Sequence, residues 1–428
     1  MAHSETATAD VTASAPDEVM RAADGTPLKD SLRRSMRRAK IKALLLVAPL
    51  GLFIFFSFAL PILDMVTRSF YSPEIANVLP RTSEQLEQWN AEGTPPEAVY
   101  AAIAKDMREA KENRELGKAS ARINYVMPGA RSLFSKTSRQ LEDLQAPYKA
   151  ALIDIDEDWG KGEVWRVMKR EADPFTVSYY LQAVDMRYDA EGNIEAAPSY
   201  MQIYQKLFWR TFWMSALITV LTLILGFPVS YLLATLPLRT SNLLMIMVLL
   251  PFWTSLLVRT SSWIVILQSQ GVLNDVLVSL GVVADDNRPQ MIYNKTGTIV
   301  GMTHILLPFM ILPLYSVMKG IPPSYMRAAR SLGANPVVAF FRVYVPQTVP
   351  GMGAGGILVF ILSIGYYITP ALIGGSSGQL ISNFIAYHMQ ESLNWHLAAA
   401  LGAILLFVVL FLYYIYNKLV GVDQMKLG

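Results

Sequence analysis

Residues 321–351 read IPPSYMRAARSLGANPVVAFFRVYVPQTVPG, and this stretch decides how the chain is interpreted. Pro322 suits the first turn of a short helix, where a missing N–H costs nothing. Gly333 stands where that helix would end in a left-handed residue. Asn335 then caps a second short helix, which we expect Pro346 to end. The pattern predicts two short helices outside the long apolar segments that flank them.

Long segments without charge make up most of the remaining chain. The 428 residues are 53% hydrophobic and only 17% charged, whereas soluble domains average about 25% charged residues. A helix needs about 20 mainly apolar residues to cross a bilayer, and a soluble core helix would carry a polar stripe. We therefore predict an all-α membrane protein with six transmembrane helices. They lie near residues 41–66, 209–235, 243–267, 298–318, 350–373 and 397–419.

The positions of the basic residues predict the orientation of these helices. Cytoplasmic loops are enriched in Lys and Arg. If six helices alternate, all the basic clusters between and around them fall on one side, so both termini are expected in the cytoplasm. The clusters comprise Arg33, Arg34, Arg37, Arg38, Lys40, Lys42, Arg239, Lys319, Arg327, Arg330, Arg342, Lys418 and Lys426.

A large polar segment separates the first two predicted helices. Residues 71–204 hold 16 Lys and Arg against 22 Asp and Glu, a net charge of −6, while the whole chain carries +3. The segment is long enough for a small domain, and we expect it on the external face. It could dock a soluble partner or shield the pore mouth. The expected divisions are a disordered basic tail (1–40), a first span (41–70), this insert (71–204) and a five-helix core (205–428) that contains a cytoplasmic loop at 319–349.

The quoted loop resembles the cytoplasmic coupling loop of ABC importer permeases. That signature runs Glu-Ala-Ala, three residues, Gly, nine residues, then Ile-x-Leu-Pro. The present chain has the same spacing, with Arg in place of the first Glu and Val in place of Ile and Leu. The matching residues, which the resemblance implies contact an ATPase subunit, are Arg327, Ala328, Ala329, Gly333, Val345 and Pro346.

Further segments look like those of the spermidine/putrescine-type (PotB-like) permeases. They read PFWTSLLVRTSSWIVIL at 251–267, GYYITPALIGG at 365–375 and NWHLAAALGAILL at 394–406. The resemblance implies a type I importer permease of the bacterial inner membrane that moves polyamines or a related small solute. It also implies ATP-binding cassette subunits, a second permease subunit as heterodimer partner, and a periplasmic substrate-binding protein. ATP and Mg²⁺ would be bound by the cassette subunits, and no cofactor is expected in this chain, which has no G-x-x-x-x-G-K-[ST] motif.

Few ionisable residues fall within the predicted spans, and each is a functional candidate. Arg259 lies in the third and His304 in the fourth, and no acid lies deep in any span. Aromatic faces could bind a cation instead, each at roughly 0.5–2 kcal/mol. The candidate translocation pathway therefore comprises Trp253, Arg259, Trp263, Tyr366 and Tyr367, although the aromatic residues also suit packing or interfacial anchoring.

Other classes of protein fit the sequence less well. Zero cysteines exclude a disulfide scaffold and a thiolate metal site. His388 and His396 are eight residues apart, which matches no helical ligand pair, so no metal site is expected. The net charge is too small to indicate nucleic-acid binding. A secondary transporter or channel that works without ATP is the alternative, but it would leave the loop spacing unexplained. Glycines 351, 353, 355, 356, 374 and 375 predict close helix packing, at a subunit interface or a hinge.

Overall fold

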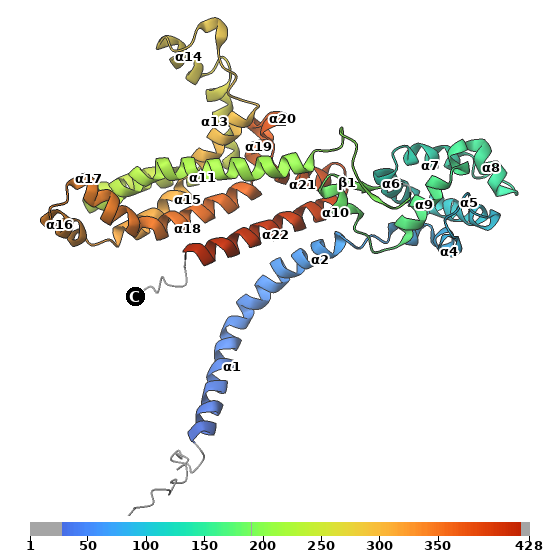
Figure 1. Cartoon of the computed structure of the whole chain (residues 1–428), viewed down its shortest axis with the longest axis horizontal. Helices are drawn as coiled ribbons and strands as arrows, with labels where there is room; N and C mark the ends of the chain where they lie inside the picture. The colour runs from blue at the N-terminus through green and yellow to red at the C-terminus, as the bar shows by residue number, and fades with distance from the viewer. Residues whose placement is uncertain (1–27, 190, 421–428) are drawn as a thin grey trace, which may run out of the picture. The chain divides into compact units, whose positions relative to one another are not determined.

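The computed structural model describes residues 28–189 and 191–420, and helices dominate them (Figure 1). The chain divides into two units, residues 1–64 and 65–428, which are taken separately here. The first unit contains α1 (Leu28–Ile54), the π-helical turn η1 (Phe55–Ala59) and the start of α2 (Leu60–Arg68). A helix already begins at Leu28, within the stretch expected as a tail at 1–40, while residues 1–27 lie outside the described part.

The insert is a compact helical segment with its own apolar core. Its largest buried side chains include Tyr100, Trp159 and Trp165. The Tyr100 hydroxyl donates to the carbonyl of Trp159 at 2.8 Å, and the Trp159 indole donates to Thr137 at 2.8 Å. Its elements are α3 (Glu74–Val78), α4 (Pro80–Gln88), α5 (Glu97–Glu112), α6 (Leu116–Val126), α7 (Ala130–Arg139), α8 (Tyr148–Ile155), η2 (Glu157–Gly160), α9 (Gly162–Ala172), α10 (Ser178–Ala183) and the antiparallel pair β1 (Met186–Tyr188) and β2 (Ile194–Ala196).

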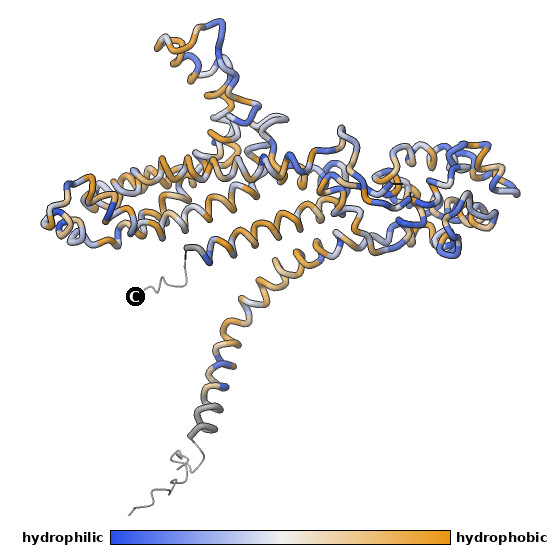
Figure 2. Tube along the Cα trace, in the orientation of Figure 1, coloured by the Kyte–Doolittle hydropathy of each residue, from blue (hydrophilic) through white to orange (hydrophobic). Residues whose placement is uncertain are grey.

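The remaining chain forms the helical core. Apolar residues run along its long helices, whereas hydrophilic residues are frequent in the insert (Figure 2). The core elements are α11 (Tyr204–Thr235), α12 (Leu238–Leu249), η3 (Leu250–Trp253), α13 (Leu256–Leu267), α14 (Val272–Ser279), η4 (Asp285–Asn287), α15 (Lys295–Lys319), α16 (Pro323–Ser331), α17 (Pro336–Ala339), η5 (Phe340–Tyr344), α18 (Val345–Gly365), α19 (Ile368–Ile373), α20 (Gly375–Gly378), α21 (Ile381–Gln390) and α22 (Trp395–Val420).

Five helices of the described chain are long and apolar enough to cross a membrane, and a bent pair makes six if it counts as one span. The single helices cover Ala39–Arg68, Tyr204–Thr235, Lys295–Lys319, Pro336–Gly365 and Trp395–Lys418. The all-α membrane class is therefore confirmed, with five spans, or six if the bent pair counts as one.

The third predicted helix, 243–267, is not continuous. It is broken into Leu238–Trp253 and Leu256–Ser279, which meet at 96°. Pro251 has no backbone N–H to continue the ladder, and Thr254 and Ser255 are extended. The Thr254 hydroxyl satisfies the carbonyl of Pro251 at 2.8 Å. The local chemistry of these residues therefore makes a bend where apolar composition alone predicts a straight helix.

The fifth span differs from the prediction at both ends. We expected Pro346 to stop the loop helix and a span to run from Pro350 to Ile373, but one helical path runs from Pro336 to Gly365. The π-helical turn η5 lies just before Pro346, and such local adjustments accommodate proline inside a helix. At the other end Tyr366 is extended, and the helix stops there.

Three helices, α11, α15 and α18, form the centre of the core, as Figure 1 shows. Gly226 of α11 lies against Met310 of α15, and Ser230 donates to the carbonyl of Ile311 at 3.2 Å. Gly351 and Gly355 lie where α18 packs against α15. Two of the six glycines predicted for close packing thus serve contacts between these helices within this chain.

Candidate functional site

The end of α16 is fixed by backbone hydrogen bonds. Gly333 has φ of +90°, a left-handed conformation that costs other L-residues roughly 1–2 kcal/mol. Its N–H donates to the carbonyl of Arg330 at 3.0 Å, and the N–H of Ala334 donates to that of Ala329 at 3.1 Å. This pair of bonds is the Schellman motif, so glycine is needed here for the turn itself.

The second short helix begins as predicted. The side chain of Asn335 accepts the N–H of Val338 at 2.8 Å, and Pro336 occupies the first turn. An N-cap of this kind contributes about 1 kcal/mol. The turn at Gly333 and the cap at Asn335 together set the direction of the chain between α16 and α17.

The loop exposes a group of large apolar side chains. Leu332 is 89% exposed, and Val337 and Phe341 are each 64% exposed. We call these three residues, with the half-exposed Tyr325, the apolar loop surface. Of the residues matched to the coupling-loop signature, Arg327, Ala328 and Gly333 are exposed beside it, and Ala329 is half-buried. Exposed apolar groups gathered in one place are typical of a docking site.

Aromatic contacts attach this loop to the core. The rings of Phe340 and Tyr344 stack at 5.5 Å, and Tyr231 of α11 meets both edge-on at 5.4 and 5.3 Å. Such pairs add about 0.5–1.5 kcal/mol each beyond burial. Lys319 also donates to the carbonyl of Ala234 at the end of α11, at 3.2 Å. Both ends of the loop are therefore tied to α11.

Three of the five pathway candidates, Arg259, Trp263 and Tyr366, lie in one region of the core together with His304. The Trp263 indole donates to Nδ1 of His304 at 3.2 Å. The Arg259 guanidinium interacts electrostatically with both His304 and Tyr366, and its Nε is buried without a hydrogen-bond partner among the described residues. The structure thus groups Arg259, Trp263 and Tyr366 around one positive charge.

The other two candidates lie elsewhere. Trp253 sits on η3 and is 76% exposed. Tyr367 follows Tyr366 at the end of the fifth span, where the backbone leaves the helix. There the carbonyl of Tyr366 accepts from Ser382 at 2.7 Å, and that of Tyr367 accepts from Asn383 at 2.8 Å. Side chains of α21 therefore replace the helix bonds that the break removes.

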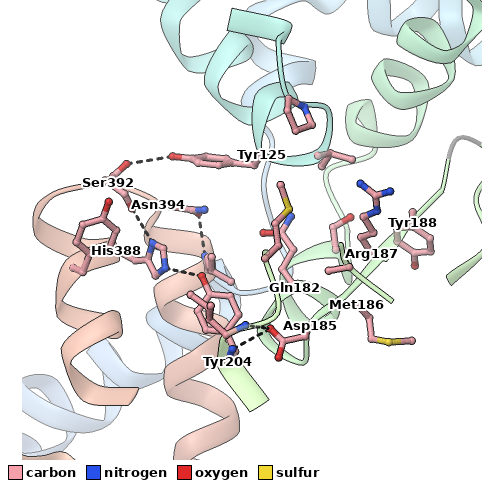
Figure 3. A pocket seen from close by; sticks show the side chains of 18 residues that line it. Tyr125, Gln182, Asp185, Met186, Arg187, Tyr188, Tyr204, His388, Ser392 and Asn394 are labelled. Carbon is pink, nitrogen blue, oxygen red and sulfur yellow. Dashed lines mark hydrogen bonds between the residues drawn. The ribbon is translucent and has the colours of Figure 1, made fainter. Parts of the chain in front are cut away.

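A cavity of about 330 Å³ lies between the insert and the core (Figure 3). His388 stands at its edge, with one ring nitrogen 2.8 Å from the Tyr204 hydroxyl and the other 2.8 Å from the Ser392 hydroxyl. Burial lowers the pKa of His388 to about 4, so the ring is neutral at pH 7. The Tyr125 hydroxyl of the insert donates to the carbonyl of Ser392 at 3.2 Å. This network joins α6, α11 and α21.

Asp185, which lies well before α11 in the sequence, caps the N-terminus of this helix. Its carboxylate accepts the N–H groups of Ile203, Tyr204 and Gln205 at 2.8–3.0 Å, and it is 4% exposed. A carboxylate at a helix N-terminus is favoured by the helix dipole. The sequence carries no signal for this role, because Asp185 lies 18 residues before Ile203, the residue that precedes the helix.

A second contact links the insert to the last span. Nδ1 of His396 in α22 lies 2.7 Å from the carbonyl oxygen of Arg68, and its Nε2 lies 2.5 Å from the carboxylate of Glu74. Burial alone would raise the pKa of Glu74, but the hydrogen bonds from His396 and Ser72 outweigh it and lower that pKa to about 2. His396 also stacks on Tyr179 at 5.0 Å. Both histidines that were weighed as metal ligands thus hold the insert in place.

The family model for the binding-protein-dependent transport system inner membrane component matches residues 206–421, half of the chain. The chain belongs to this family. Residues 71–204 and the first span lie outside the match. The protein is accordingly a multi-pass permease subunit of a binding-protein-dependent importer, and the sequence-based assignment to this class is confirmed.

Curated relatives resemble the same part of this permease. The spermidine/putrescine transport system permease protein PotB of Haemophilus influenzae is 35% identical over 206 residues, 47% of this chain and 71% of the relative. PotB of Escherichia coli is 35% identical over 191 residues, 45% of this chain and 69% of the relative. The inner membrane ABC transporter permease protein YdcU of E. coli is 31% identical over 214 residues, 48% of this chain and 68% of the relative.

Solved structures resemble the permease more distantly. A chain of a bacterial ABC transporter involved in the import of the acidic polysaccharide alginate is 20% identical, with a TM-score of 0.39, over 50% of this chain and 79% of that one. A second structure, of a bacterial alginate ABC transporter in complex with an alginate pentasaccharide-bound periplasmic protein, has a TM-score of 0.38 at 18% identity and covers 52% of this chain and 82% of that one.

Proposed function

We propose that this permease imports polyamines such as spermidine and putrescine, driven by ATP that partner cassette subunits hydrolyse. The relatives at 35% identity are spermidine/putrescine permeases, which supports the substrate class. The observation that carries the mechanism is the apolar loop surface, whose exposed Leu332, Val337 and Phe341 suit burial in a groove of a soluble subunit. Both termini and this loop would lie in the cytoplasm, and the insert would lie in the periplasm.

The loop would transmit the movement of the ATPase subunits to the spans. Arg327, Ala328, Ala329 and Gly333 would lie in the contact, and α17 continues into the fifth span through Val345 and Pro346 without a break. A second permease subunit would complete the pore, and a periplasmic substrate-binding protein would deliver the amine from outside.

Purification of the tagged permease in mild detergent tests the partners. We expect an ATP-binding cassette subunit and a second permease to be recovered with it. Leu332→Asp should abolish recovery of the ATPase but keep the second permease, because the buried contact would then contain an unpaired charge. Leu280→Asp, at a residue 71% exposed just after α14, serves as a control that keeps the ATPase.

Replacement of Gly333 tests the coupling. In vesicles that contain the complete transporter, Gly333→Val should reduce spermidine uptake at least tenfold while ATP hydrolysis continues, because the turn that presents the loop is strained. Gly281→Val is the matched control, since Gly281 also has a positive φ and open space around it. Amine uptake that persists without any ATPase subunit would instead favour the ATP-independent carrier.

A further inference from the structure

A cavity of about 360 Å³ lies where the fifth span ends. The residues that line it belong mainly to α21 and to the break at Tyr367, and they do not include Arg259, Trp263 or Tyr366. The residues that matter for its chemistry are Tyr367, Gln379, Asn383, Tyr387, Gln390 and Glu391. With Phe384, three aromatic rings, three amides and one carboxylate thus share one cavity at the end of a span.

The cavity leaves its carboxylate free to bind a ligand. Glu391 is exposed, and its carboxylate has no hydrogen bond or ion pair within the described chain. Asn383 is occupied, since its side chain donates to the carbonyl of Tyr367 and accepts from Leu380 at 3.0 Å. Arg210, the basic side chain on this side, donates to the carbonyls of Ser376 and Gln379 at 3.0 and 3.3 Å. Its charge is therefore directed at the backbone.

Residue spacing brings the acid and one ring together. Tyr387 and Glu391 are four residues apart at the C-terminal end of α21, a spacing that places side chains on one helix face. The negative end of a helix dipole also favours a cation at this point. Tyr367, 40% exposed, and Tyr387, 46% exposed, present ring surface to the same cavity.

The two neighbouring tyrosines, Tyr366 and Tyr367, lie near charges of opposite sign. Tyr366 is within electrostatic range of the Arg259 guanidinium, which repels a positively charged solute. Tyr367 borders the cavity that contains Glu391. A carboxylate with aromatic faces is the arrangement that binds an ammonium group, because the negative face of an aromatic ring attracts a cation. A protonated amine would thus be drawn to the Tyr367 side of the break.

We propose that Glu391, Tyr367 and Tyr387 form a binding site for a protonated primary amine on the permease itself. This site rests on the proposed function, since it supplies the acid that the core spans lack. Glu391 would pair with the ammonium group, and the two rings would cover its flanks.

Spermidine binding to the detergent-solubilised transporter without its binding protein tests this site. We expect Glu391→Gln to weaken the Kd measured by calorimetry at least tenfold, and Tyr387→Leu to weaken it while Tyr387→Phe, which keeps the ring, binds like the wild type. Asp286→Asn, at an exposed acid of η4, controls for net charge and should leave the Kd unchanged.

The outcomes separate this site from the proposed function. A wild-type transporter that imports no amine with its binding protein would refute the polyamine assignment. A transporter that imports spermidine, but whose Kd is the same with Glu391→Gln or shows no binding in the absence of the binding protein, would refute this site and leave the function standing.

Discussion

Single glycines decide how closely the central spans approach. A Cβ on Gly351 would lie 3.0 Å from Cβ of Val317, 3.2 Å from Cα of Leu314 and 3.2 Å from the carbonyl oxygen of Pro313. None of these atoms is the flexible end of a side chain, so α15 and α18 would have to separate. Gly351→Ala should cost about 1–3 kcal/mol, the usual effect of overpacking.

The thermal midpoint of the purified permease measures this cost. Gly356→Ala is the matched control, because Gly356 lies in the same helix and its Cβ would meet only Thr219 at an ordinary 3.8 Å. We expect Gly356→Ala to keep or raise the midpoint, since alanine is the better helix former. Equal midpoints for the two variants would contradict the close approach at Gly351.

At the scale of elements, α21 should respond to acid through His388. The pKa of this buried ring is lowered to about 4, below the value of about 6.5 for an exposed histidine. The unfolded chain therefore binds more protons as pH falls from 6.5 to 4, and stability is lost over that interval. The loss should be on the order of 1–2 kcal/mol by pH 5, after allowance for solvent screening.

Thermal unfolding at pH 7.5 and pH 5 checks this expectation. His388→Gln keeps a polar side chain but cannot titrate, so the difference between its two midpoints should be smaller than in the wild type. A wild-type difference no larger than that of His388→Gln would show that the ring takes up its proton without cost in the folded protein.

The existence of the helices was predicted from the sequence more accurately than the residues at which they begin and end. Charge-free runs identified the five single spans and the bent pair because lipid tolerates few charges. Gly333 and Asn335 marked the loop correctly because helix ends are local. The break after Gly365 could not be predicted, since Ser382 and Asn383, which satisfy its carbonyls, belong to another helix. Pro346 was misleading because a π-helical turn allows the helix to continue. The cavity beside Glu391 depends on residues that only the fold brings together.

For the molecule as a whole, the insert should fold without the spans. Its largest core cluster lies entirely within residues 75–168. At the edge of this cluster Arg122 and Glu171 form an ion pair, and both are nearly inaccessible. Residues 73–183 produced alone, which keep Ser178 and Tyr179 beside that pair, should therefore be helical and unfold cooperatively, with a near-ultraviolet circular dichroism signal from Trp159 and Trp165. Glu171→Ala should remove several kcal/mol, because it leaves the buried Arg122 charge unpaired.

Far-ultraviolet and near-ultraviolet spectra through a thermal transition test this expectation. Glu142→Ala is the control, since Glu142 pairs with Lys111 at the surface, where such pairs contribute about 0–1 kcal/mol. A fragment with helical signal but no near-ultraviolet bands would show that the core needs the membrane part to pack.

The uninterrupted helix from Pro336 to Gly365 also has a mechanical consequence. Thirty residues at 1.5 Å each make a rod about 45 Å long. Turned by about 10° around one end, a rod of that length carries its other end about 8 Å. It joins the exposed loop at one end to the two tyrosine carbonyls held by Ser382 and Asn383 at the other. A small tilt of α17 would therefore move the other end of the helix by more than the length of a hydrogen bond. We expect that movement to break the hydrogen bonds from Ser382 and Asn383 to the two tyrosine carbonyls.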